Sequence, residues 1–158
     1  MAALDRIDFQ ILGLLRKNAR LSNKEIAEKV GLAPSTCLVR TRMLQKSGAI
    51  TGFKAELNPL ALGVGLQAMI AVRLKRHYKP DVEAFRSHAL DLPEVVRLYH
   101  VAGPIDFLAH VWAKDPEHLR DLAMTAFTAR EEVSHIETEL IFEHISCREL
   151  PAFLDQPV

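Results

Sequence analysis

Apolar residues in the first third of the chain recur at helical spacing. One helix is predicted to begin at Ser22, because Ser22 and Glu25 stand three residues apart and each can accept the other's free backbone N–H. Gly31 is placed to take the left-handed conformation that ends this helix. A preceding amphipathic helix, able to cover the helix pair that follows it, is predicted from the apolar positions Leu4, Ile7, Ile11, Leu12, Leu14 and Leu15.

A third helix is predicted over residues 34–47. Pro34 is tolerated at a first helical position, because its missing N–H would have no partner there. The charged residues of this stretch are all basic, namely Arg40, Arg42 and Lys46. A helix pair with such a second member is typical of a helix-turn-helix, which lays that helix in the DNA major groove. Residues 49–57 alternate weakly and predict a short strand or wing.

The C-terminal half has the pattern strand, helix, strand, strand, helix, strand. In the first of these strands, apolar residues at Ala68, Ile70 and Val72 alternate with a second face that is also mostly apolar. The pattern predicts an antiparallel ferredoxin-like sheet with both helices on one face. The other strands are expected over residues 95–101, 105–113 and 133–145, and the helices begin at Pro80-Asp81 and Asp115-Pro116.

A break in regular structure separates the two halves. Pro59 disfavours a helical conformation at Asn58. We therefore expect an α+β protein with a three-helix, winged helix-turn-helix domain over residues 1–58. A hinge over residues 59–63 and a ferredoxin-like βαββαβ domain over residues 64–158 complete the expected organisation.

The second face of the predicted sheet carries apolar residues that the helices would not cover. Met69, Ala71, Leu108 and Trp112 belong to this face. An exposed apolar patch on a protein usually marks an interface. A two-fold homodimer formed through this face is the simplest solution, because C2 pairing is the commonest closed symmetry.

The formal net charge of zero hides an uneven distribution. Residues 1–58 contain ten Lys and Arg against five Asp and Glu, a surplus of five positive charges that the remainder of the chain balances. Such asymmetry indicates an N-terminal half that meets a polyanion. No apolar run approaches the roughly 20 residues of a membrane span, and no signal peptide is visible. The two cysteines, Cys37 and Cys147, fall in different predicted domains and are expected to stay reduced, as in a cytoplasmic protein.

The chain resembles the Lrp/AsnC (feast/famine) family of bacterial and archaeal transcription regulators over nearly its whole length. The matching segments are LDRIDFQILGLL, KNARLSNKEIA, VGLAPSTCLVRTRMLQKSGAI and TGFKAELNPLALG. The resemblance implies a sequence-specific regulator of transcription, dimeric through its ferredoxin-like domain and often tetrameric or octameric. It also implies control by a small effector, often an amino acid. One departure is Ala33, where the family often has a serine as helix cap.

The helix-turn-helix pattern predicts which residues contact DNA. Arg40 is the candidate for a bidentate contact to guanine, and the later basic residues are candidates for phosphate contacts. The alternative for Arg40 and Arg42 is a solvated charge or a pair with a neighbouring acid, while Leu38, Thr41 and Leu44 are expected in the core. The expected DNA contacts are Ser35, Thr36, Val39, Arg40, Arg42, Lys46 and Lys54.

The resemblance places an effector site at the turn between the second and third strands. Gly103 lets the backbone approach a ligand closely, and Asp106 can accept hydrogen bonds from an ammonium group. The family commonly has hydroxyl residues where this chain has Val101 and Ala102, which argues against a polar amino acid. The alternative is a plain hairpin turn in which Asp106 caps its own loop. The candidate residues are Tyr99, Val101, Ala102, Gly103, Asp106 and, from a neighbouring subunit, Thr138.

Enzymatic functions are not favoured. The sequence has no Gly-rich phosphate loop, nucleophile elbow or paired-carboxylate signature. Its seven histidines lack ligand-like spacing, so neither a metal nor a cofactor is expected. The remaining enzyme alternative is a tetrapyrrole (siroheme-type) decarboxylase, which shares this two-domain layout. The basic third helix argues against it.

Overall fold

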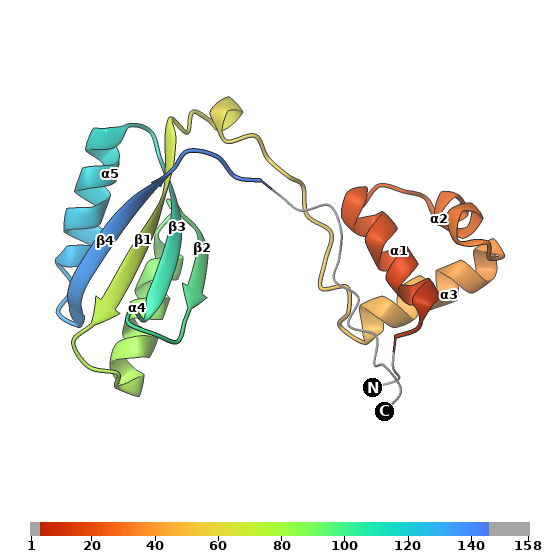
Figure 1. The fold of residues 1–158 in the computed structure, drawn as a ribbon, viewed down its shortest axis with the longest axis horizontal. Coiled ribbons are helices and arrows are strands. Elements are labelled where there is room, and N and C mark those ends of the chain that lie inside the picture. The colour runs from red at the N-terminus through yellow and green to blue at the C-terminus, as the bar shows by residue number, and fades with distance from the viewer. Residues whose placement is uncertain (1–3, 146–158) are drawn as a thin grey trace. The chain divides into compact units, whose positions relative to one another are not determined.

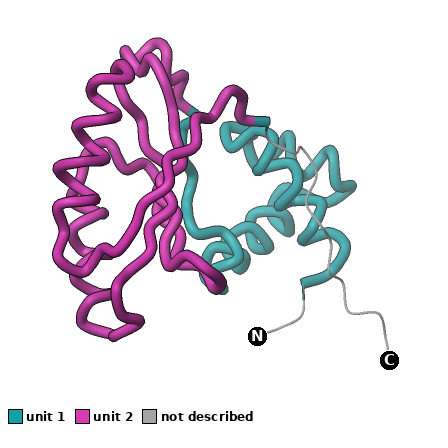
Figure 2. Tube along the Cα trace, turned by 60° about the vertical axis from the view of Figure 1, so that its left-hand side comes forward, with its two compact units in different colours: residues 1–56, 145–158 teal, residues 57–144 magenta. Residues whose placement is uncertain are grey.

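The computed structural model describes residues 4–145, which fall into two compact units: the first contains the residues up to Glu56 together with Ile145, and the second spans Leu57–His144 (Figure 2). The first unit consists of three helices and the second of a sheet with helices (Figure 1). The α+β organisation expected from the sequence is confirmed.

The first unit begins with two helices that carry reciprocal caps. At α1 (Arg6–Lys17), the Asp5 carboxylate accepts the Asp8 N–H at 2.9 Å, and the Asp8 carboxylate accepts the Asp5 N–H at 3.1 Å. At α2 (Asn23–Val30), Ser22 and Glu25 form the capping pair predicted from their spacing. Gly31 ends α2 with a φ of 69°, the left-handed conformation that glycine adopts at little steric cost.

The third helix, α3 (Pro34–Lys46), buries two residues, Cys37 and Leu44. They stand seven positions apart, which is about two helical turns, and so lie on the same side. Leu38 was expected in the core but is 38% exposed, because one residue further along turns the side chain about 100° away from that side. The core of this unit is formed by Ile11, Leu15, Ile26, Ala27, Cys37 and Leu44.

Residues 49–57 contain no strand, so the expectation of one there is wrong. A strand is stable only when its backbone pairs with a neighbour, and the sheet described for the chain lies wholly in the second unit. Ile50 instead closes the end of α3: its N–H donates to the Leu44 carbonyl at 3.0 Å, and its side chain packs on the three-helix core.

The second unit has the predicted βαββαβ order. Its antiparallel sheet has the strand order β2-β3-β1-β4. The elements are a 3-10 turn η1 (Leu60–Leu62), β1 (Leu66–Leu74), α4 (Lys79–Asp91), β2 (Val95–His100), β3 (Phe107–Ala113), α5 (Pro116–Leu122), a π-helical turn η2 (Ala123–Thr128) and β4 (Val133–Ile141).

The last strand is shorter than expected. It was predicted over residues 133–145 but ends at Ile141, which pairs with Gln67 near the beginning of β1. Only Leu66 of β1 lies beyond this pair, so little of β1 remains for the strand to pair with, although its residues remain apolar in part. β2 and β3 are likewise slightly shorter than predicted, since they stop at the two sides of the turn over residues 101–106.

One face of the sheet carries the core and both helices. The buried residues of β1 and β3 alternate as predicted, and α4, α5 and η2 contribute Phe85, Leu119, Leu122 and Phe127. The opposite face, which we call the open face, includes Met69, Ala71, Leu108 and Trp112, all half-buried.

Candidate nucleic-acid interface and effector site

A row of exposed side chains runs along α3. Successive residues on a helix turn by about 100°, so these side chains project within about a third of its circumference. Two large apolar residues, Val39 and Met43, are 56% and 60% exposed in the middle of the row. The α3 row, as we call it, consists of Ser35, Thr36, Val39, Arg42, Met43 and Lys46.

Arg40 does not belong to this row. Its Nη1 donates to Asp5 Oδ2 at 2.7 Å and to Asp8 Oδ1 at 2.9 Å, and its side chain is 31% exposed. The same carboxylates cap α1, so one guanidinium ties the middle of α3 to the beginning of α1. The structure thus places Arg40 in the arrangement that the sequence left as an alternative, a pair with neighbouring acids.

The charges around Arg40 shift one another's protonation. The hydrogen bonds that Arg40 donates to Asp8 and Asp5 raise the pKa of Arg40 above its ordinary value. The Asp8 N–H, and after it the Arg40 guanidinium, lowers the pKa of Asp5 below its ordinary value. Arg40 and Asp5 therefore each favour the charged form of the other.

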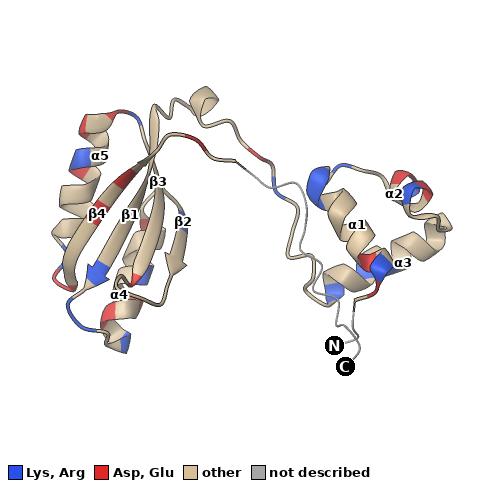
Figure 3. Ribbon diagram, in the orientation of Figure 1, with Lys and Arg blue, Asp and Glu red and all other residues tan. Residues whose placement is uncertain are grey.

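The other predicted basic contacts are available to an anion. Arg42, Lys46 and Lys54 are exposed, and within residues 4–145 no carboxylate lies at ion-pair distance from any of them. α3 itself contains no acidic residue, and the acids of this unit lie on other segments (Figure 3). Exposed cations without an acidic partner are suited to a polyanion such as the DNA backbone.

The beginning of α3 is held by a residue that the sequence analysis missed. Ala33 makes no side-chain cap, as its identity predicts. Instead, Asn23 Nδ2 donates to the Pro34 carbonyl at 2.6 Å and so connects the first turns of α2 and α3. The contact spans 11 positions, so local spacing gave no signal for it.

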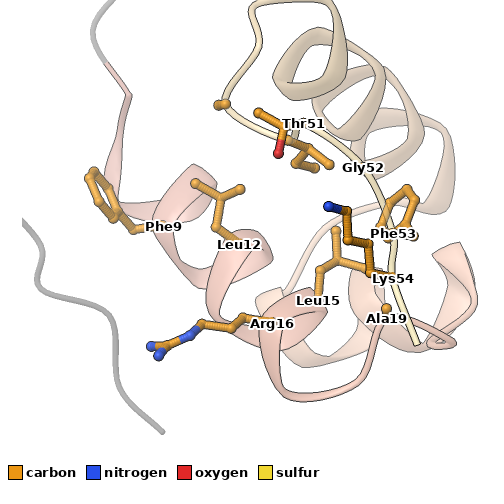
Figure 4. A pocket seen from close by; sticks show the side chains of 11 residues that line it. Phe9, Leu12, Leu15, Arg16, Ala19, Thr51, Gly52, Phe53 and Lys54 are labelled. Atoms are coloured by element: carbon orange, nitrogen blue, oxygen red, sulfur yellow. The ribbon is translucent and has the colours of Figure 1, made fainter. Parts of the chain in front are cut away.

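A groove lies between α1 and the segment that follows α3. It encloses about 460 Å³, with Phe9, Leu12, Leu15 and Arg16 on the α1 side and residues 49–54 opposite (Figure 4). Lys54, one of the predicted phosphate contacts, lines this groove with Phe53 rather than lying on α3.

The turn predicted as an effector site uses its carboxylate internally. Asp106 Oδ2 accepts the Leu74 N–H at 2.7 Å, and Asp106 Oδ1 lies 2.6 Å from His77 Nδ1. The carboxylate is 13% exposed, and both of its partners lie at or just after the end of β1 rather than in its own loop, an arrangement that neither expectation included. Gly103 has a φ of 138°, a conformation that side-chain-bearing residues rarely adopt, so the turn depends on glycine.

The remaining predicted effector residues do not meet within one chain. Tyr99 lies on β2 beside Leu108, on the open face. Thr138 lies on β4 at the other edge of the sheet, on the face that carries the helices, beside Ile70. It lines a separate groove of about 380 Å³ that includes Met124 and Leu140. Any site that uses both Tyr99 and Thr138 needs a second copy of the chain.

The open face carries a hydrogen-bonded polar group among its apolar residues. Gln67 Oε1 accepts the indole N–H of Trp112 at 3.0 Å and lies 3.0 Å from His110 Nε2. Burial lowers the pKa of His110 below its ordinary value, and the charges of Arg97 and His144 act in the same direction. The neutral imidazole is therefore favoured on this face.

Among residues 4–145, no group of three or more His, Cys, Asp or Glu is placed to hold a metal ion. None of the helices described is long and apolar enough to cross a membrane.

The three-helix unit with its basic α3, together with the ferredoxin-like unit, defines a DNA-binding regulator with a separate ligand-binding domain. Residues 4–51 match the family described as "Winged helix-turn-helix DNA-binding", and residues 67–151 match the "Lrp/AsnC ligand binding domain". The chain belongs to the Lrp/AsnC family of transcriptional regulators.

Its relatives include curated regulators of similar length. The HTH-type transcriptional regulator AldR of Mycolicibacterium smegmatis is 44% identical over 142 residues, covering 90% of this chain and 83% of the relative. The leucine-responsive regulatory protein of Escherichia coli is 35% identical over 143 residues, covering 90% and 87%. These relatives are transcriptional regulators, which gives no support to the decarboxylase alternative.

Solved structures of transcriptional regulators also superpose on this chain. A transcriptional regulator from Neisseria meningitidis, solved as a complex with L-Met, superposes with a TM-score of 0.87 at 30% identity and covers 96% of this chain and 98% of that one. The crystal structure of MtbAldR gives a TM-score of 0.71 at 37% identity, with 90% and 97% covered.

Proposed function

We propose that this regulator binds DNA by inserting the α3 row into the major groove, with Arg42, Lys46 and Lys54 on phosphates. The observation that carries the proposal is the exposure of these cations without a carboxylate partner among residues 4–145. Ser35, Thr36 and Val39 stand near the beginning of α3, where side chains of a recognition helix approach base edges. Arg40 holds α3 against α1 in this arrangement, and a guanine contact by Arg40 requires it to leave both carboxylates.

We infer that the DNA-binding form is a homodimer or a larger assembly with closed symmetry. Half-buried apolar side chains on the open face, among them Met69 and Leu108, support pairing through this face. Pairing also supplies two copies of α3 related by a two-fold axis, and two such helices can read half-sites about one DNA turn, or a multiple of it, apart. Tetramers and octamers are the larger assemblies included in this proposal.

We also propose that an amino acid controls the regulator. The match to a ligand-binding domain and the L-Met complex of the Neisseria meningitidis relative support this proposal. Tyr99, Val101, Ala102, Gly103 and Asp106 of one copy would contact the effector together with Thr138 of another copy. The apolar side chains of Val101 and Ala102 favour an apolar amino acid. A cytoplasmic location follows from the DNA partner.

The salt dependence of DNA binding tests the proposal. Binding to the DNA upstream of its own coding region is measured at several salt concentrations, because each phosphate neutralised makes the slope of log K against log salt more negative by about 0.9. Lys46→Gln is expected to weaken binding to all sequences and to reduce the slope by about 1 for each α3 engaged. A slope that is flat for the unaltered protein would contradict phosphate contact.

A further inference from the structure

The two apolar residues of the α3 row do not belong to the three-helix core that residues 4–145 form. Val39 and Met43 stand one turn apart on the same face of α3, and neither packs on the core of its unit. The apolar residues that α3 contributes to that core are Cys37 and Leu44. Large apolar side chains held in water at the centre of a helix surface indicate contact with something that is itself partly apolar.

The surroundings of these residues indicate what that partner is. Arg42 lies between Val39 and Met43 in sequence, and Lys46 follows one turn later, both without a carboxylate partner in the described part of the chain. Ser35 and Thr36 add hydroxyl groups at the other end of the row. A partly apolar surface bordered by cations and hydroxyls is complementary to the major groove, where the C5-methyl of thymine is the apolar feature and phosphates form the rim.

The arrangement of Arg40 makes an arginine–guanine contact the weaker alternative at the centre of this surface. Both carboxylates that bind Arg40 belong to the beginning of α1, and the side chain emerges about 100° around α3 from Val39. To reach a base, Arg40 would have to exchange two charge-assisted hydrogen bonds for two others.

We propose that Val39 and Met43 read thymine methyl groups, so that the sequence preference of this regulator depends on apolar contacts at the centre of α3. The inference rests on the proposed insertion of α3 into the major groove. One helical turn advances about 5.4 Å, and successive base pairs are about 3.4 Å apart. The two thymines are therefore expected one or two base pairs apart in each half-site.

Replacing thymine by uracil tests the proposal, because this change removes only the methyl group. DNA sites are first selected from a random library with the full chain, and each thymine of the selected site is then replaced in turn. Burial of one such group is worth about 0.8 kcal/mol, so affinity is expected to fall about fourfold at each contacted thymine in a half-site. Val39→Ala and Met43→Ala are each expected to abolish the loss of affinity caused by uracil at one position of the half-site. Each substitution and its uracil replacement then form a double-mutant cycle, in which a non-additive result identifies the side chain and the methyl group that are in contact.

Gln45→Ala provides the matched control, since Gln45 is an exposed residue of α3 on a different side from the row. This variant is expected to keep the full sensitivity to uracil. Because all three substitutions are at exposed positions, thermal unfolding should show that the variants fold as the unaltered chain does.

The possible failures are distinguishable. If uracil has no effect at any position, or if Val39→Ala and Met43→Ala keep the whole effect, the methyl-reading role is wrong while DNA binding stands. If selection enriches no sequence and binding is insensitive to salt, the proposed function itself fails.

Discussion

Arg40 and Arg42 stand two positions apart on one helix and have different surroundings. The Arg40 guanidinium binds the two carboxylates that cap α1, whereas Arg42 is exposed and meets no carboxylate within residues 4–145. Residue type and local spacing did not distinguish them, since both are arginines on a basic helix. The distinction came from Asp5 and Asp8, which lie 35 and 32 positions away from Arg40.

These surroundings predict opposite effects of two similar substitutions. Arg40→Ala is expected to lower the midpoint of thermal unfolding, because it removes the ion pairs that join α1 and α3 and leaves two carboxylates close together. Arg42→Ala is expected to leave the midpoint unchanged and to weaken DNA binding through loss of a phosphate contact. Thermal unfolding and DNA affinity measured on both variants check this. Equal midpoints for the two variants would show that the Arg40 pairs do not contribute to stability.

At the scale of the elements, the two ends of α2 were predicted correctly from the sequence. The Ser22–Glu25 cap and the left-handed Gly31 follow from residues within one helical turn of each other, and the structure confirms both. The weakly alternating segment 49–57 was misjudged, because alternation shows which side of a strand is apolar but not whether a partner strand exists. The apolar face of a helix is predictable as a whole, yet a single position such as Leu38 at its border is not.

The two capping boxes predict how the helical unit responds to acid. Hydrogen bonds to Asp5 and Glu25 lower their pKa values below the ordinary 3.8 and 4.5. A carboxylate whose pKa is lower in the folded state stabilises the fold above its ordinary pKa, and this contribution is lost as the pH falls through the folded value. The free energy of unfolding is therefore expected to decrease as the pH falls below about 4.5.

Urea unfolding followed by circular dichroism between pH 6 and pH 2 measures this dependence. Asp5→Asn is expected to make the decrease at acid pH shallower. Glu28→Gln removes an exposed carboxylate from α2 and controls for the change of charge. If Asp5→Asn and the unaltered chain lose stability equally between these pH values, the Asp5 cap does not respond to protonation.

On the scale of the whole molecule, the proposed assembly depends on surfaces that one chain leaves uncovered. In this assembly, a second copy of the chain covers the open face of the sheet, and Thr138 contacts an effector held by another copy. Met69 lies near the middle of the open face and pairs across the strands with Glu139. A lysine at this position can bind Glu139 within the chain while placing a charge on the apolar surface.

Met69→Lys is therefore expected to fold as the unaltered chain does. It should be monomeric at protein concentrations at which the unaltered chain is still assembled. Its DNA affinity should also fall, because the two copies of α3 no longer bind together. Analytical ultracentrifugation across a range of concentrations measures the dissociation. Leu60→Lys, at an exposed apolar residue outside the strands, is the control and should leave assembly intact. Unchanged assembly in Met69→Lys would exclude the open face as the interface.

The amino-acid sequence by itself determined the order of the elements, the cap and the end of α2 and the apolar faces of the strands. These features arise from hydrogen bonds and periodicities among residues that are neighbours along the chain. Only the tertiary structure decided where β4 ends, that Arg40 joins α1, and that the Asp106 carboxylate binds Leu74 and His77. Each of these depends on which distant residue comes to lie opposite, and folding of the whole unit is what brings such residues together.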